Sequence, residues 1–241
     1  MAAVGLVVLG TLTSGDRAQA SHVSCGDTIT ADTTLDSDLI DCPNNGILIG
    51  ADGITLDLNG HLIDGDGAPA AGCDLEVEFC DTGVANDGHD GVTVMHGSVR
   101  ELAQGVSVVE GARHNRVLGI SSSKNFFFGI VVVNSARSLV RGTSGNRNLA
   151  PEGDGMGVFF SHHIRILHNS FRRNSGPGIH VGDSTDNLIK GNEFSRNQPA
   201  LLIEGSDRNR VRRNRFVRGS EGILVTGNGN RNVIARNRIF R

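Results

Sequence analysis

The C-terminal third of the chain repeats one short pattern four times. An Ile or Val is followed three residues later by Asn and two residues after that by Phe or Ile, and the copies begin at Ile166, Ile189, Val211 and Ile234. The periods are 23, 22 and 23 residues. A fixed period in this range is typical of a solenoid, in which each repeat stacks on the next. Equivalent side chains then form columns about 4.8 Å apart, the spacing of strands in a sheet.

Leucine-rich repeats, helical repeats and parallel β-helices have repeats near this length. Helical repeats do not fit, because the units are rich in Gly, Asn and Ser and lack apolar spacings of three and four. Leucine-rich repeats do not fit, because Ile, Val and Phe stand where Leu is needed. What remains are short strands such as Gly178–Val181 and Leu201–Ile203, bounded by turn-forming residues. Three strands and three turns use about 22 residues, so the sequence predicts an all-β, single-stranded, right-handed parallel β-helix.

The Asn of each repeat is expected to be structural. Asn tolerates left-handed turns, and stacked Asn amides bond one another along a column. The expected ladder consists of Asn169, Asn192, Asn214 and Asn237, and the expected core stack beside it consists of Phe171, Phe194, Phe216 and Ile239.

Earlier coils continue the pattern less regularly. The segments Gly105–Val108, Gly129–Val132 and Gly157–Phe160 match Gly178–Val181, and the long step before Val158 is assigned to a loop at Asn148–Asp154. The outward side chains of these strands are then expected to form an apolar stripe with one histidine. The stripe would contain Val131, Phe159, His180, Leu202 and Leu224.

Residues 2–12 form an apolar run that is too short to span a membrane, and Ala18-Gln19-Ala20 follows it. This pattern predicts a secretory signal peptide over residues 1–20, incomplete because its basic start is missing, with an ordinary first strand as the alternative. The mature chain, residues 21–241, would be secreted or lie at the cell surface, without a membrane span. It stops partway through a coil, which favours either truncation of a longer protein or self-association through the open coil.

All four cysteines, Cys25, Cys42, Cys73 and Cys80, lie in the first 80 residues. Their spacing is not that of a zinc site, so we expect disulfides and no metal there. We prefer the sequential pairs Cys25–Cys42 and Cys73–Cys80, which would staple an N-terminal cap and a loop, although four cysteines allow three connectivities.

Charge is distributed unevenly along the chain. Residues 1–100 contain 2 basic and 16 acidic residues, whereas residues 101–241 contain 21 basic and 10 acidic residues. The basic residues recur at equivalent positions of successive repeats, so they do not form a nucleic-acid-binding arm. One column comprises Arg173, Arg196, Arg218 and Arg241. Either these arginines are solvated and paired with Glu193, Glu204 and Glu221, or they dock an extended polyanion, since Arg matches carboxylate and sulfate groups.

The segment Cys25–Leu39, the dipeptide Cys42-Pro43 and the segment Gly53–Gly65 resemble the start of secreted bacterial parallel β-helix proteins of the pectin-lyase-like superfamily, and the coils from Gly91 onward resemble its repeats. The resemblance implies the fold and the N-terminal cap. The superfamily includes pectate lyases, polygalacturonases, alginate epimerases, carbohydrate-binding coils, non-catalytic surface proteins and copper-delivery proteins. The chain lacks the Asp-Asp pair of polygalacturonases, the Asp-Pro-His-Asp string of alginate epimerases and a Met/His cluster for copper.

A candidate acid–base cluster contains His180, Asp154 and Asp183, with Glu204 one coil further on. Phe159 offers a surface for a sugar ring, although the chain has no Trp or Tyr. His162 and His163, near His168, form a candidate metal pair that strand alternation disfavours. The acidic segment 64–90 is a candidate Ca²⁺ site through oxygen ligands, without EF-hand spacing.

Two functions follow from these observations. The first is binding or processing of a polysaccharide, preferably an anionic glycan, by a lyase-like or hydrolase-like protein, with Arg173, Arg196, Arg218, Phe159 and Glu204 as substrate-binding residues. The second is a non-catalytic surface protein that uses the solenoid as a spacer or protein-interaction face. The resemblance and the arginine column support the first function, whereas the apolar stripe, the missing enzyme motifs and the absence of Trp and Tyr support the second. Both functions stay open at this point.

Overall fold

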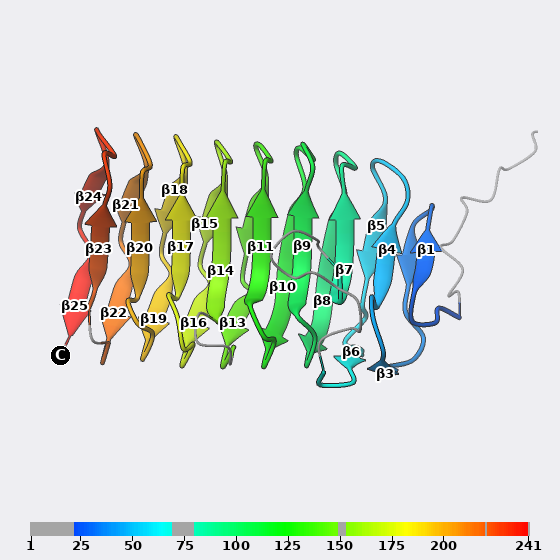
Figure 1. Cartoon of the computed structure of the whole chain (residues 1–241). Coiled ribbons are helices and arrows are strands. Elements are labelled where there is room, and N and C mark those ends of the chain that lie inside the picture. The colour runs from blue at the N-terminus through cyan, green and yellow to red at the C-terminus, as the bar shows by residue number, and fades with distance from the viewer. Residues whose placement is uncertain (1–21, 69–79, 149–152, 220, 241) are drawn as a thin grey trace, which may run out of the picture.

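The chain forms one parallel β-helix whose coils stack along a single axis (Figure 1). A computed structural model describes residues 22–68, 80–148, 153–219 and 221–240, and all the regular secondary structure in these ranges is β-strand. The predicted fold class is therefore confirmed. The predicted signal peptide lies outside the described residues.

One sheet contains nine parallel strands, which face the viewer in Figure 1. In spatial order they are β1 (Asp27–Ile29), β4 (Ile47–Ile49), β7 (Thr82–Asp87), β9 (Gln104–Val109), β11 (Phe128–Val133), β14 (Asp154–Phe159), β17 (Ile179–Gly182), β20 (Leu201–Glu204) and β23 (Ile223–Thr226).

The second sheet has two arms that join at β10 (Arg116–Ser123), because the two halves of this long strand pair with different neighbours. The first arm runs through β12 (Leu139–Arg141), β15 (Arg165–Leu167), β18 (Leu188–Lys190), β21 (Arg210–Arg212) and β24 (Val233–Ala235). The second arm runs through β13 (Ser144–Asn146), β16 (Ser170–Arg172), β19 (Glu193–Ser195), β22 (Arg215–Val217) and β25 (Arg238–Phe240). Toward the N-terminus, β10 pairs with β8 (Thr93–Arg100), which continues to β5 (Thr55–Asp57), β6 (Leu62–Gly65), β2 (Thr33–Thr34) and β3 (Leu39–Cys42).

One coil therefore consists of a strand of the nine-stranded sheet, a strand of the first arm and a strand of the second arm, as in β17, β18 and β19. From β15 onward the strands are only three or four residues long, because the chain must turn three times within each repeat. Many of these turns contain a residue in the left-handed conformation, such as Gly191 with φ 70°. Gly adopts this conformation at low cost, but Arg, His and Asp hold it at most of the other turns. The ladder asparagines are not left-handed themselves, contrary to expectation: each follows a left-handed residue, as Asn192 follows Gly191.

The predicted Asn ladder and the predicted stack of Phe171, Phe194 and Phe216 are both present, whereas Ile239, the last predicted member of the core stack, is 61% exposed. The Oδ1 atom of Asn192 accepts two hydrogen bonds from Asn169, one from its backbone N–H at 2.8 Å and one from its side-chain Nδ2 at 3.1 Å. The same pattern continues from Asn192 to Asn214 and from Asn214 to Asn237. Phe194 stacks between Phe171 and Phe216, with ring centroids 5.5 and 4.7 Å apart. Column formation thus satisfies buried polar groups and fills the core at the same time.

Three further polar ladders occur, and the sequence analysis did not identify them. The shortest contains Asn187, Asn209 and Asn232, and the remaining two are longer. One contains Asn125, Asn148, Asn174 and Asn197, linked through side-chain oxygens that accept backbone N–H groups. The other contains Ser135, Ser161, Ser184 and Ser206. Both are regular enough to have been found from the recurrence of Arg-Asn and of single Ser residues.

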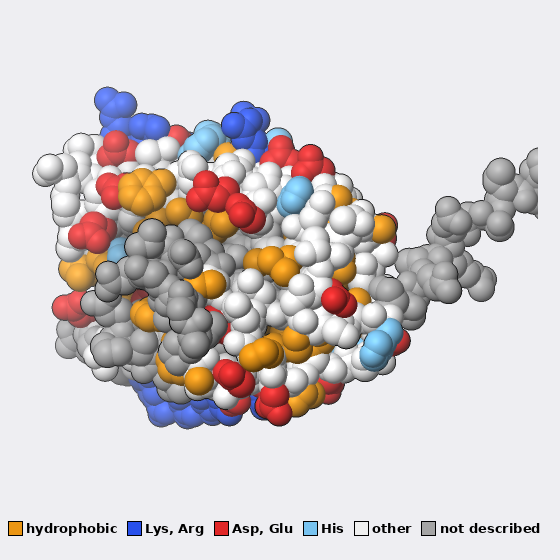
Figure 2. Space-filling model, turned by 45° about the vertical axis from the view of Figure 1, so that its right-hand side comes forward, with side chains coloured by type: hydrophobic (Ala, Val, Ile, Leu, Met, Phe, Trp, Pro, Cys, Tyr) orange, Lys and Arg blue, Asp and Glu red, His pale blue; other side chains and the backbone are white. Residues whose placement is uncertain are grey.

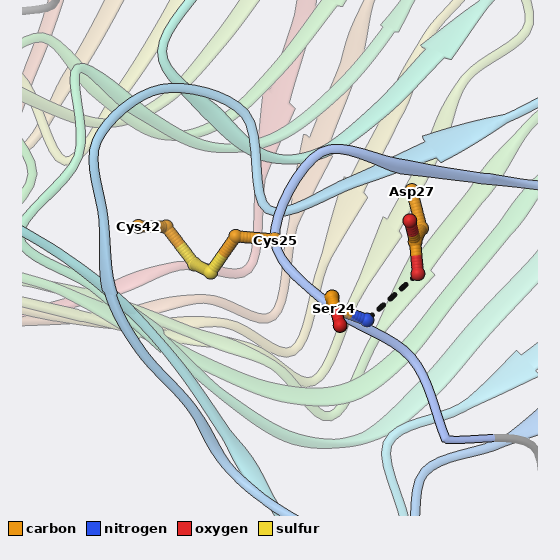
Figure 3. The surroundings of a disulfide bond; sticks show 4 residues. All are labelled: Ser24, Cys25, Asp27 and Cys42. Atoms are coloured by element: carbon orange, nitrogen blue, oxygen red, sulfur yellow. Dashed lines mark hydrogen bonds between the residues drawn. A yellow bond between two sulfur atoms is a disulfide. The ribbon is translucent and has the colours of Figure 1, made fainter.

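A disulfide closes the N-terminal end of the solenoid, as predicted. Cys25 and Cys42 are bonded, and Ser24 beside them donates its backbone N–H to Asp27 at 2.8 Å (Figure 3). The bond ties the segment before β1 to the end of β3, so it holds the first coil closed. The second preferred pair, Cys73–Cys80, includes Cys73, which lies outside the described residues.

The predicted alignment of Gly157–Phe160 with Gly178–Val181 was wrong by two residues. Met156 and Gly157 pair with Ile179 and His180, whereas Phe159 pairs with Gly182. The outward column is therefore Val131, Gly157, His180, Leu202 and Leu224, without Phe159. The insertion before β14 is shorter than expected, since residue pairing steps from Ile130 to Met156 and not to Val158.

The described residues contain no helix that is long and apolar enough to cross a membrane.

Candidate functional site

A groove lined by arginines runs along the second arm and the corner that follows it. Its volume is about 630 Å³. Two of its arginines, Arg172 and Arg215, belong to β16 and β22, and the others occupy the corner itself. The arginines that line the groove are Arg147, Arg172, Arg173, Arg196, Arg215 and Arg218.

Three residues of the predicted arginine column, Arg173, Arg196 and Arg218, occupy equivalent corner positions as expected. Each has a left-handed backbone, with φ of 58°, 58° and 53°. The fourth, Arg241, lies outside the described residues. The turn itself does not require arginine, because Gly142 and Gly191 hold the same conformation at another corner. The charge at this column therefore needs an explanation other than backbone geometry.

The column also extends one coil further toward the N-terminus than predicted. Arg147 has φ 56° and lines the same groove, and Lys124 occupies the equivalent corner before it. Sequence analysis missed them because the insertion after Asn148 breaks the even period. The available signal was a basic residue followed by Asn, which recurs at residues 124, 147, 173 and 196.

The expected acidic partners do not neutralise this column. Glu193 bonds Arg172 at 2.8 Å, and Glu204 bonds His180 on the nine-stranded sheet. Within the described ranges, no ion pair links a carboxylate to Arg173, Arg196 or Arg218. Glu193 and Glu204 therefore pair with other residues, whereas Arg173, Arg196 and Arg218 are exposed to solvent. Docking of a polyanion on this column stays a prediction. The groove carries one acidic side chain against six basic ones.

The nine-stranded sheet brings His180 of β17 between two carboxylates. The Nδ1 atom of His180 lies 3.6 Å from Oδ2 of Asp154, and its Nε2 atom lies 3.3 Å from Oε2 of Glu204. The Asp154 side chain is only 4% exposed, and the His180 side chain is 22% exposed. Parallel pairing of β14, β17 and β20 places these three residues on successive coils.

Opposing effects act on His180. Burial disfavours the imidazolium, but the hydrogen bonds and negative charges of Asp154 and Glu204 outweigh it and raise the pKa of His180. A histidine with such partners can hold or release a proton near neutral pH. Asp183 is an exposed turn residue, and no ion pair or hydrogen bond joins its carboxylate to His180 among the described residues.

Aromatic rings flank this cluster. Phe159 packs edge-on against His180, with centroids 4.9 Å apart, and against Phe128 at 5.8 Å. Gly157, which pairs with His180, has no side chain, and the Phe159 ring fills the space that a side chain there would occupy. Phe159 therefore contacts His180 although the two residues belong to different columns. In Figure 2 the Lys and Arg side chains gather along the upper and lower edges of the visible face, whereas acidic and hydrophobic side chains are scattered over it.

The two neighbouring histidines are closer than strand alternation predicted. The Nδ1 atoms of His162 and His163 lie 2.9 Å apart. Alternation does not apply, because His163 has φ 59° and therefore turns out of the extended conformation. His168 belongs to another corner, next to Gly191, so it does not join the pair.

The acidic segment 64–90 uses several carboxylates for separate structural contacts. Asp64 forms a bidentate pair with Arg100 at 2.8 and 2.7 Å, and Asp81 accepts the Ala103 backbone N–H at 3.0 Å. No group of three or more potential ligands occurs in the described part of the chain. Asp74, Glu76 and Glu78 lie outside that part, and Ca²⁺ binding stays a prediction.

The fold and its ladders define this chain as a parallel β-helix protein, and comparison with known proteins agrees. The chain belongs to the family described as "Periplasmic copper-binding protein (NosD)", which matches residues 60–241. This membership supports an extracytoplasmic location. No curated protein sequence gave a significant match.

Solved structures of similar shape include a mutant of the periplasmic alginate epimerase AlgG (14% identity, TM-score 0.61, 87% of this chain and 51% of that chain). DFA-IIIase from Arthrobacter chlorophenolicus A6 without its lid is also similar (14%, 0.60, 81% and 61%). So is the Dettilon tailspike protein gp208 (15%, 0.56, 83% and 42%). At these identities the likeness shows the fold. The chain spans about half to three fifths of the length of the first two relatives.

Copper is the metal that the family description names, so its fit to the described residues can be tested. Imidazole nitrogens suit copper, but the described residues contain no group of three or more His, Cys, Asp or Glu side chains that could hold a metal ion. The paired Nδ1 atoms of His162 and His163 are the donor set that fits best. They would supply two of the ligands of a copper ion.

Proposed function

We propose that this chain is an extracytoplasmic β-helix protein that binds an anionic polysaccharide along its arginine groove. The observation that carries the proposal is a row of corner arginines that form no ion pair with a carboxylate of the described residues: Arg147, Arg173, Arg196 and Arg218. Arg forks bind carboxylate and sulfate groups through paired hydrogen bonds. Because one arginine recurs per coil, the row suits a linear polymer with regularly spaced charges.

Two similar structures support a glycan as the ligand. One is an alginate epimerase, and alginate is an acidic polysaccharide; another is a tailspike protein. Both share the fold of this chain at low identity, so they support the class of ligand and not a particular glycan.

The test is a binding titration of a polyuronate, a sulfated glycan and a neutral glucan at several salt concentrations. We expect the two acidic polymers to bind and the neutral one not to bind, with affinity falling as salt rises, because exposed charges are screened. In the triple variant Arg173→Gln, Arg196→Gln, Arg218→Gln, affinity should fall about tenfold or more, at roughly 0.5 kcal/mol or more per lost contact.

The matched control is Arg137→Gln, Arg231→Gln, Arg236→Gln. These exposed arginines also have left-handed backbones, with φ of 57°, 58° and 58°, but they do not line the groove. The control removes the same charge, so general attraction would weaken equally in both variants. Equal weakening, or equal binding of the neutral glucan, would contradict a specific groove.

A second candidate function is acid–base chemistry on the bound glycan. His180 and the buried Asp154 favour it, since this carboxylate could hold the imidazole in place while it transfers a proton. One end of this His180–Asp154 cluster lies close to the arginine groove. The Nδ2 atom of Asn148, the residue after Arg147, donates to the backbone carbonyl of Asp154 at 2.6 Å. Ultraviolet absorbance of unsaturated products during the same titration separates a lyase from a binding protein. Absence of binding to every glycan would favour the non-catalytic, partner-binding function.

A further inference from the structure

We propose that the outer face of the first arm binds the surface of a membrane that contains anionic phospholipids. From β10 to β21 each strand buries one residue, such as Ile166, between two that are exposed or half-buried, and the same two positions continue in β24. We call the surface that these two side chains of each strand form the first-arm face. The inference does not rest on glycan binding, because none of these side chains lines the arginine groove.

Cations recur along the first-arm face. Strand pairing places its side chains in two parallel columns, and from β10 to β18 the cation changes column at every coil. The cations of the face are Arg116, Arg141, Arg165, Lys190, Arg210 and Arg212. Among the described residues no carboxylate forms an ion pair with any of them.

Apolar side chains fill the remaining positions of the face. They are Leu118, Leu139, Leu167, Leu188, Val233 and Ala235. From β10 to β18 every cation therefore has a leucine beside it in its own strand and another directly opposite it on a neighbouring strand. The leucines are half-buried, and the aliphatic stems of Arg and Lys pack readily beside such side chains.

Charge repulsion explains the spacing of the cations but not the lack of acidic residues. Like charges directly opposite each other on neighbouring strands destabilise a sheet, so alternation with another residue keeps the cations apart. Glu or Asp at the alternate positions would achieve this and add favourable cross-strand pairs. The face uses leucine instead, and leucine gains free energy only when a partner removes it from water. This pattern favours a partner that is both anionic and apolar.

A phospholipid surface matches both parts of the pattern. Anionic headgroups attract Lys and Arg near the membrane, while apolar side chains enter the boundary between headgroups and acyl chains. A glycan fits less well, because the face has no aromatic ring and no hydroxyl or amide side chain. The strands lie side by side along one axis, so the face presents its columns to one planar surface (Figure 1).

A recess at the β24 end of the face combines the same two properties. Its volume is about 380 Å³. Its lining consists of Arg210, Arg212, Arg213, Arg236, Val233 and Ala235. No ion pair neutralises these arginines within the described part of the chain. A lipid phosphate group in this recess would meet several guanidinium groups, which bind phosphate through paired hydrogen bonds.

The test is sedimentation of the full chain with vesicles of phosphatidylcholine alone or of phosphatidylcholine mixed with phosphatidylglycerol. We expect binding only to the vesicles that contain phosphatidylglycerol, and weaker binding as salt rises. The triple variant Arg141→Gln, Arg165→Gln, Lys190→Gln should lose affinity at least tenfold, since each cation near the membrane surface contributes to binding.

The matched control is the groove variant Arg173→Gln, Arg196→Gln, Arg218→Gln, which removes the same charge from another face. At physiological salt it should bind the vesicles within about twofold of the wild type, because exposed charges far from the contact are screened. The first-arm variant should in turn keep its affinity for acidic glycans. The two surfaces are thereby tested separately, and either proposal can fail without the other.

A reporter of direct contact can be introduced, because the chain contains no Trp. In Leu188→Trp the emission should shift to shorter wavelength when phosphatidylglycerol vesicles are added. Leu202→Trp, at a half-buried position of the nine-stranded sheet, should keep its emission. Circular dichroism checks that all variants fold.

Three results would overturn the proposal. The first is the absence of binding to the phosphatidylglycerol vesicles, and the second is an equal loss of vesicle binding in the groove variant. The third is an unchanged emission of Leu188→Trp on bound vesicles. Binding of polyglutamate without binding of vesicles would assign the face to an acidic protein partner and would likewise contradict a lipid surface.

Discussion

His180 combines burial with two carboxylate partners, and its protonation is tied to the folded state. The Asp154 carboxylate beside it is almost completely buried. Protonation of His180 therefore supplies a positive charge next to Asp154 and Glu204 that unfolding would remove. The same pairing that makes the histidine a candidate acid or base makes it a contributor to stability.

The pH dependence follows from the direction of this shift. Because the folded pKa of His180 is raised above its usual value of about 6.5, its contribution is fully present below that pH and is lost as pH rises through the folded pKa. The free energy of unfolding of the wild type should therefore exceed that of His180→Gln by more at pH 6 than at about pH 9. Denaturant unfolding at both values measures this difference. A constant difference would mean that His180 stabilises only by packing against Phe159.

At the scale of the strands and turns, the polar ladders offset the cost of burying Asn side-chain amides, because each buried amide is hydrogen-bonded along its ladder. Each corner carries a buried amide, and the amide of the next coil bonds it. Asn192 shows the full pattern: its Nδ2 atom donates to the Ile166 carbonyl at 2.9 Å, and its Oδ1 atom accepts two bonds from Asn169. Removing one member leaves buried groups of its neighbour without partners.

Asn192→Ala should therefore lower the free energy of unfolding by at least about 2 kcal/mol, since the Asn169 backbone N–H is left unsatisfied in a dry corner. The exposed Asn228 provides the control, and Asn228→Ala should change stability by less than about 0.5 kcal/mol. Denaturant unfolding of both variants measures the two effects. A small loss for Asn192→Ala would show that water replaces the amide.

At the scale of the whole molecule, each coil contacts only its neighbours, so local damage should stay local. The Cys25–Cys42 bond links residues 17 apart at one end of the solenoid, far along the axis from β23 (Figure 1). A bond that closes a loop of this length contributes about 3 kcal/mol.

The double variant Cys25→Ser, Cys42→Ser should loosen the first coils and spare the last ones. Hydrogen exchange is expected to speed up in β1 and β4 by about a hundredfold, in line with that free energy, while exchange in β17 and β20 stays within about twofold. Peptide-resolved mass spectrometry measures both regions. Uniform loss of protection along the chain would mean that the solenoid unfolds as one cooperative unit.

The repeat alone determined the fold class, the Asn169–Asn237 ladder, the Phe stack and the corner column of Arg173, Arg196 and Arg218. The positions of the cysteines, and not the repeat, made Cys25–Cys42 the preferred disulfide. A strict period carries this information because stacking places every equivalent residue in one column, so a local pattern becomes a three-dimensional one. The prediction failed where the period fails. Because of the insertion after Asn148, the predicted alignment of β14 was off by two residues and Phe159 was assigned to the wrong column. For the same reason Arg147 was not recognised as a member of the arginine column.

Only the tertiary structure decided which side chains meet across coils and around corners. It placed His180 next to Asp154 and Glu204 but not Asp183, showed that Glu193 pairs with Arg172, and brought His162 and His163 together through one left-handed residue. These outcomes depend on backbone conformation at single turn positions and on rotamers of long side chains. Neither follows from hydrophobic periodicity, because periodicity records which face a residue takes and not which neighbour it reaches.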